Sequence, residues 1–109
     1  MVDHTVMLSE GFKAFLAETP GQARAWSRAN EELGAASALD PKTQSLAYLA
    51  VLAALGLESG VPFHATLARE AGASRAEVLS AILVGLPAAG HVVTQVLPAA
   101  IRAYDEAPR

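Results

Sequence analysis

The chain has 109 residues, a net charge of −3 and no cysteine, so we expect one domain without disulfides, cysteine-ligated zinc or thiol nucleophiles. Hydrophobic residues make up 52% and charged residues 17%, against about 25% charged in an average domain, so a small interior has much apolar surface to bury. We therefore expect a homo-oligomer. The basic residues are scattered, which excludes a nucleic-acid stripe, and the absence of a signal-peptide pattern predicts a cytoplasmic protein.

Helix start and stop signals follow one another along the chain. The run from Thr19 to Gln22 has the pattern of a capping box with proline at the first helical position. Asp40-Pro41 repeats the cap and the proline, and Ser74 to Glu77 forms another capping box. Glycines that fit helix ends are Gly34, Gly56 and Gly72. These signals predict helices at about 6–18, 21–34, 41–56, 60–71, 75–86 and 89–105.

Two of these helices are almost free of charge. Leu46 to Leu57 has no charged residue, and Val78 to Val93 has none apart from His91. A helix that is apolar all round is buried all round, and both runs are shorter than the about 20 residues that a bilayer needs. We therefore expect burial between subunits and no membrane partner. Pro87 predicts a turn between the fifth and sixth helices, and Pro98 predicts a kink inside the sixth.

His64 is the first candidate for a functional residue. Helical spacing aligns it with apolar Val61 and Leu67 and places Thr66 on another face, so we expect the imidazole to point toward the interior. It can exchange a proton near neutral pH. It can equally be a core histidine whose hydrogen bonds go to a backbone carbonyl or to the hydroxyl of Ser45 or Tyr48. Both interpretations remain open.

The segment Leu49 to Gly56, the histidine eight residues after Gly56, and Ala71-Gly72 resemble the carboxymuconolactone decarboxylase family, over roughly Leu39 to Tyr104. This resemblance implies an all-α, compact bundle of about six helices, similar to alkylhydroperoxidase D, that assembles as trimers or hexamers. In the alkylhydroperoxidase D branch the segment carries a Cys-x-x-Cys pair, a histidine and an upstream glutamate. The matching positions here are Leu57, Gly60, His64 and Ser45. The absence of thiols favours the cysteine-free decarboxylase branch.

Two further residues are weighed beside His64. Glu58, in the turn before the fourth helix, can supply a carboxylate to a pocket, although acids at this position more often face solvent and complement the helix dipole. His91 follows Gly85 to Gly90, which resembles a stretch near the family's site wall. Two histidines without an assured third ligand make a weak zinc site, so we expect no metal and no cofactor.

The sequence thus predicts one domain over 1–109, and the resemblance implies a decarboxylase-like lyase activity on a small organic acid or lactone. His64 is the expected acid or base, with Glu58 as a second catalytic residue. The expected pocket residues are Ser45, Tyr48, Gly60, Phe63 and His91. The alternative is a non-catalytic helical oligomer that binds a small apolar ligand or a partner protein. The resemblance supports the fold more strongly than the reaction, because no arginine lies within 43–68 to hold an acid.

Overall fold

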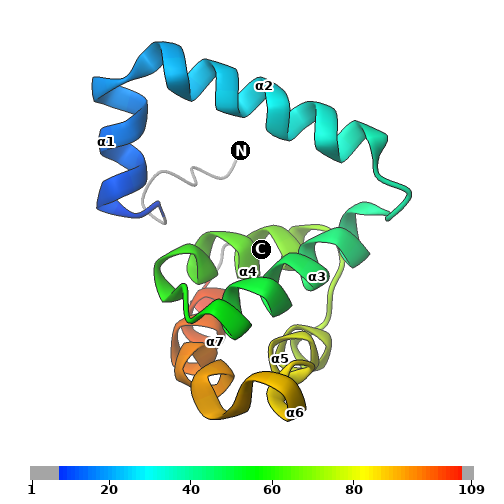
Figure 1. The fold of residues 1–109 in the computed structure, drawn as a ribbon. Coiled ribbons are helices and arrows are strands. Elements are labelled where there is room, and N and C mark those ends of the chain that lie inside the picture. Colours follow the sequence, from blue (N-terminus) through cyan, green and yellow to red (C-terminus); the bar gives the residue numbers. More distant parts are fainter. Residues whose placement is uncertain (1–7, 107–109) are drawn as a thin grey trace.

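A computed structural model describes residues 8–106, and all regular structure in that part of the chain is helical (Figure 1). The all-α prediction is therefore confirmed. The α-helices are α1 (Glu10–Glu18), α2 (Pro20–Ala36), α3 (Pro41–Leu55), α4 (Val61–Glu70), α5 (Arg75–Leu83), α6 (Leu86–Ala89) and α7 (Leu97–Glu106). Two 3₁₀ segments join them, η2 (Glu58–Gly60) and η3 (Gly90–Val96).

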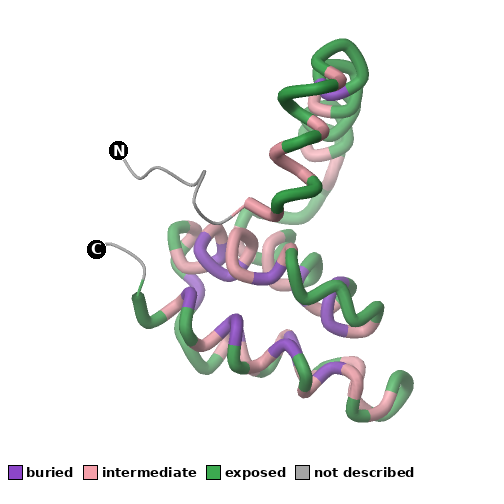
Figure 2. Tube along the Cα trace, turned by 90° about the vertical axis from the view of Figure 1, so that its left-hand side faces the viewer, coloured by how far each residue is buried: buried purple, intermediate pink, exposed green. Residues whose placement is uncertain are grey.

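Helices α1 and α2 form an arm that stands away from the remaining helices (Figures 1 and 2). Phe12 and Phe15 of α1 contact the Trp26 ring of α2, with ring centroids 5.5 and 6.1 Å apart. Ala23, which is 4% exposed, is the one buried residue that α1 and α2 contain. The radius of gyration, 14.0 Å, slightly exceeds the about 13 Å of a compact domain of this length. The arm therefore packs mainly on itself and leaves one side facing the core.

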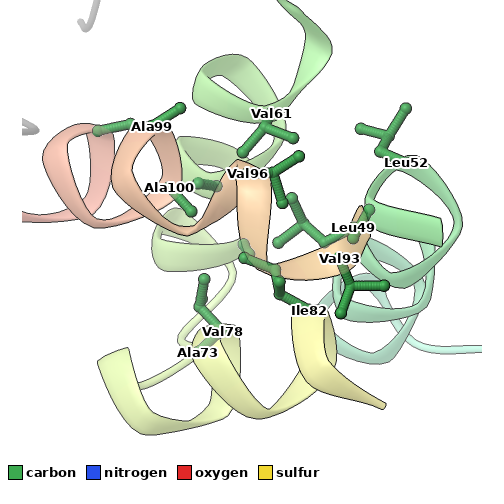
Figure 3. Close-up of a cluster of buried hydrophobic side chains, with 14 residues drawn as sticks. Leu49, Leu52, Val61, Ala73, Val78, Ile82, Val93, Val96, Ala99 and Ala100 are labelled. Carbon is green, nitrogen blue, oxygen red and sulfur yellow. The ribbon is translucent and has the colours of Figure 1, made fainter. Parts of the chain in front are cut away.

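The core lies among α3, α4, α5, η3 and α7 (Figure 3). Its largest fully buried side chains include Leu49, Ile82, Val78, Val93 and Val96. Alanines on α4 and α7 let these helices approach closely, since a methyl side chain adds little thickness at the contact. They are Ala65, Ala68, Ala99, Ala100 and Ala103.

Most of the predicted helix ends are confirmed. The Asp40 carboxylate accepts from the Thr43 N–H at 2.8 Å, and Ser74 and Glu77 form the expected capping box. Gly56 and Gly72 take positive φ angles of 70° and 99°, which glycine adopts without steric cost. These caps set both ends of α3 and the turn from α4 into α5.

Three predictions about the arm were wrong. Helix α1 begins at Glu10, after the Ser9 hydroxyl accepts from the Phe12 N–H, and residues 6 and 7 lie outside the described part. The Thr19 side chain does not cap α2, because its hydroxyl donates to the Phe15 carbonyl at 2.6 Å. Gly34 does not end α2, which continues to Ala36 without a positive φ at the glycine.

The predicted sixth helix is divided into α6, η3 and α7. Gly90 has a φ of 78° and interrupts the α-helix, and η3 continues with 3₁₀ geometry to Val96. Pro98 lies in the first turn of α7, where a backbone N–H would have no acceptor within the helix. Proline therefore costs no hydrogen bond there, and the predicted kink inside a long helix was wrong. Pro87 similarly lies in the single turn of α6.

Arg75–Glu106 is long and apolar enough by composition to cross a membrane. The chain does not run straight there: it breaks at Val84–Gly85 and again at Gly90, and α7 packs back against α5 (Figure 1). A folded-back path of this kind buries apolar side chains of α5, η3 and α7 against each other. The buried side chains of the segment, which include Val78, Ile82 and Val93, belong to the core.

The two charge-free runs, Leu46 to Leu57 and Val78 to Val93, were expected to be buried on all sides. On the single chain only their inner faces are buried. Leu49 and Ile82 are fully buried, whereas Val51, Leu55 and Val84 are 52%, 65% and 69% exposed on the single chain. Exposed apolar side chains indicate a contact surface where they form one contiguous patch.

Tyr104 connects α7 to the turn before α5. Its hydroxyl donates to the Ala73 carbonyl at 2.8 Å, and Ala73 is 3% exposed. We expect Tyr104→Phe to lower the free energy of unfolding by about 1 kcal/mol, because that carbonyl loses its donor. Urea denaturation measures this change. Tyr48→Phe is the matched control, since the Tyr48 hydroxyl has no protein partner within residues 8–106, and equal losses in the two variants would contradict the assignment.

Candidate functional site

A cavity of about 550 Å³ lies between the arm and the core. On the arm side the lining comes from the segment before α1, from Phe12 of α1 and from Trp26 and Asn30 of α2. On the core side it comes from α3, η2 and α4. The lining residues are Leu8, Ser9, Phe12, Trp26, Asn30, Gln44, Ser45, Tyr48, Ser59, Gly60, Phe63, His64 and Leu67. The predicted pocket residues Ser45, Tyr48, Gly60 and Phe63 therefore lie around His64.

His64 reaches this cavity because of its position on α4. Val61, Ala65 and Ala68 of that helix are fully buried in the core, so the neighbouring face, which carries His64, is turned toward the arm. The imidazole is half-buried. The sequence prediction therefore placed the imidazole too deep. Thr66 lies on another face of α4, as predicted, where it is fully buried and donates its hydroxyl to the Pro62 carbonyl at 3.0 Å.

Two aromatic rings hold the imidazole of His64. The Tyr48 ring centroid lies 4.3 Å from the His64 centroid at 46°, and the Phe63 centroid lies 5.2 Å away at 80°. Neither imidazole nitrogen has a hydrogen-bond partner within residues 8–106. Ser45 and Tyr48 line the same cavity but do not satisfy the ring, so the interpretation of His64 as a hydrogen-bonded core histidine is not supported there. The nitrogens are available to a ligand or to water.

Burial lowers the pKa of His64 below its ordinary value of 6.5. Desolvation is the cause, because an imidazolium loses hydration in this setting and gains no carboxylate among the lining residues. At neutral pH the ring is therefore neutral, with one nitrogen that accepts and one that donates a hydrogen bond.

This pKa shift predicts how stability depends on pH. Above pH 6.5 the ring is neutral in both the folded and the unfolded states, so this residue contributes no pH dependence. As the pH falls below 6.5, the unfolded chain takes up the proton first, and the folded state loses stability until the pH passes the lower pKa of the folded protein. Urea unfolding of wild type and His64→Gln from pH 7 to pH 5 measures this loss. We expect wild type to lose stability relative to the variant; a difference that stays constant with pH would contradict the shift.

The family model for the carboxymuconolactone decarboxylase family matches residues 20–102. The chain belongs to this family. The matched region begins in α2, earlier than the expected start near Leu39, and so includes Trp26 and Asn30 on the arm side of the cavity. No curated protein and no solved structure matches the chain.

Within the family's pattern, the two thiol positions of the peroxidase branch are Leu57 and Gly60. Leu57 is 50% exposed, whereas Gly60 lines the cavity. A Cβ at Gly60 would meet the Leu52 methyl groups at 3.5 and 3.6 Å, which is ordinary contact, and its φ is −86°. Neither close packing nor backbone conformation therefore requires glycine there. Its effect is to leave open space beside His64 where the peroxidase branch carries a thiol.

The other two predicted site residues lie elsewhere. Glu58 and His91 are exposed, and neither lines this cavity. Within residues 8–106, no group of three or more His, Asp or Glu side chains is arranged to hold a metal ion. The structure thus brings His64 together with Ser45 and Tyr48, but not with Glu58 or His91.

Sequence reasoning missed the part of the site that the arm supplies. Phe12, Trp26 and Asn30 line the cavity, and none of them was among the predicted pocket residues. The available signal was aromatic: Phe12, Phe15 and Trp26 lie on two successive helices joined by a single residue, which brings their rings together.

Proposed function

We propose that this carboxymuconolactone decarboxylase family protein binds a small organic acid or lactone in the arm–core cavity and that His64 exchanges a proton with it. The observation that carries the proposal is a neutral, half-buried imidazole facing a cavity of about 550 Å³, with neither nitrogen bonded to a described residue. A cavity of this size, mostly apolar with a few polar groups, is typical of small-molecule sites.

The lowered pKa favours the role of base. A neutral imidazole can take a proton from a carbon next to a carbonyl, or from water that attacks a lactone, and the imidazolium then returns the proton to the product. The Tyr48 and Phe63 rings support this role by fixing the orientation of the imidazole. Thiol peroxidase chemistry is excluded, because the chain has no cysteine.

A second candidate function is ligand or partner binding without catalysis. It is favoured because Ser45 stands where the peroxidase branch has a glutamate. Among the lining residues that the structure describes there is therefore no carboxylate to relay a proton from His64. Under this function the cavity retains its affinity for a small molecule, but the bound molecule is released unchanged.

Self-association as a trimer or hexamer belongs to either function. It is supported by the exposed Val51, Leu55, Leu57 and Val84, which would be covered by sister copies. Sedimentation at micromolar concentration tests it: a species of three or six subunits is expected, and a stable monomer would contradict the proposal.

The experiment that separates the two functions is a turnover assay. Purified wild type and His64→Gln are incubated with a panel of unsaturated lactones and 2-keto acids, and substrate loss is followed by mass spectrometry. Turnover by wild type that depends on His64 supports the enzyme, whereas equal rates for the two proteins would reject His64 as the acid or base.

A further inference from the structure

The part of the cavity lining that the structure describes carries no permanent charge. Its polar side chains are hydroxyls, amides and one imidazole, namely Ser9, Asn30, Gln44, Ser45, Tyr48, Ser59 and His64. Within residues 8–106, none of the lining residues is Lys, Arg, Asp or Glu. Groups of this kind can donate and accept hydrogen bonds, but they offer no counter-charge to an ion.

The consequence for an anionic ligand is unfavourable. A carboxylate that enters a mostly apolar cavity loses hydration, and that loss is offset only where a cation or several hydrogen bonds replace the water. Burial also keeps the His64 imidazole, which lines the cavity, neutral at pH 7. An uncharged molecule avoids this cost.

Both walls of the cavity present aromatic rings. On the arm side Phe12 and Trp26 lie with centroids 5.5 Å apart at 69°, and on the core side Tyr48 and His64 lie 4.3 Å apart. Trp26 and Tyr48 are each 46% exposed, so both have ring surface to cover. Ring faces and edges contact planar ligands favourably, beyond the simple burial of area.

We propose that the cavity selects a neutral, planar ring compound, such as an unsaturated lactone or an aromatic amide, over an ionised acid. The ligand contacts Trp26 from the arm and Tyr48 with His64 from the core, and its polar group bonds to the amides and hydroxyls. This inference rests on the site of the proposed function and narrows its substrate class. It implies that the reaction at His64 is a proton transfer on an uncharged molecule.

Trp26 provides the readout, because it is the sole tryptophan of the chain. The full-length protein is titrated at pH 7.5 with benzamide, with benzoate and with cyclohexanecarboxamide, while tryptophan fluorescence is recorded. These probes share a size, and they differ in charge or in planarity. We expect a saturable change with benzamide, and affinities for the other two that are at least about tenfold weaker.

A positive charge introduced into the lining tests whether the absence of a cation causes the preference for an uncharged ligand. Ser45→Lys places an ammonium group in the lining and is expected to reverse the preference, so that benzoate binds more tightly than benzamide. The matched control is Ser80→Lys, at an exposed serine of α5 outside the lining, which should keep the wild-type order. A variant Tyr48→Ala is expected to weaken benzamide binding.

Several outcomes would overturn the inference. Benzoate binding to wild type as tightly as benzamide would reject the ligand class while leaving a site at His64. Benzamide binding that is unaffected by Tyr48→Ala would place the ligand elsewhere, and no saturable change with any probe would reject the site itself. Conversely, selective benzamide binding by a protein that turns over no substrate would keep this inference and reject the proposed reaction.

Discussion

Turnover by the His64→Gln protein is expected to fall by about 10² to 10⁴-fold, the usual contribution of a positioned acid or base. Glutamine keeps a hydrogen-bonding side chain of similar length but cannot exchange a proton near neutral pH. Because burial lowers the pKa of His64, the rate of wild type should rise with pH through a value below 6.5 and then stay constant. The measurement is kcat/KM as a function of pH for any substrate that wild type converts.

His91→Gln makes the same chemical change at an exposed residue outside the cavity and serves as the control. Its rate should equal that of wild type. A loss in His91→Gln as large as that in His64→Gln would mean that the site extends to η3, against the arrangement described above.

The variant Leu49→Ala should lower the free energy of unfolding by about 2 to 5 kcal/mol. Leu49 is fully buried at the centre of the core, where α3 meets α5 and η3, and alanine would leave a void beside Ile82 and Val93 (Figure 3). A domain of this size has about 5 to 15 kcal/mol of stability in total, so the loss is a large share. Chemical denaturation of wild type and variant measures it.

The matched control is Leu33→Ala, the same truncation at a leucine that is 71% exposed on α2. Its expected effect is within about 0.5 kcal/mol, because little contact is lost. Comparable losses at the two positions would show that the arm, rather than the α3–α7 body alone, is part of the cooperative core.

Local signals in the sequence were sufficient for the helices of the core. The Asp40 and Ser74 caps and the glycines at 56 and 72 act within one turn of the helix end that they define. Interactions of such short range can be predicted from neighbouring residues. They set both ends of α3, the end of α4 and the start of α5 correctly to within one residue.

Errors arose where a residue had a competing partner. Thr19 fits a cap, but its hydroxyl bonds back to Phe15, and Gly34 fits a helix end, but α2 continues through it. In the C-terminal third, the long apolar run hid the break at Gly90, because hydrophobic periodicity does not distinguish α-helix from 3₁₀ geometry. The competing partner of Thr19 lies only one helical turn earlier in the chain, so even a local alternative can defeat a cap signal.

Only the core side of the cavity could be predicted from the sequence. Ser45, Tyr48, Gly60, Phe63 and His64 belong to a single hairpin, so the family's spacing brings them together. The arm wall depends on how α1 and α2 fold back over that hairpin, which local signals do not specify. Glu58 illustrates the same limit, since a turn residue beside the helix can face either the cavity or solvent, and it faces solvent.

The most direct test of the site is the response of the individual histidines to a bound molecule. In protein with ¹⁵N-labelled histidine, saturation with benzamide is followed by NMR of the imidazole signals. We predict that the His64 signals shift while those of His91, exposed and outside the cavity, stay in place. Unchanged His64 signals in a protein that has bound benzamide would contradict the claim that this imidazole faces the ligand cavity.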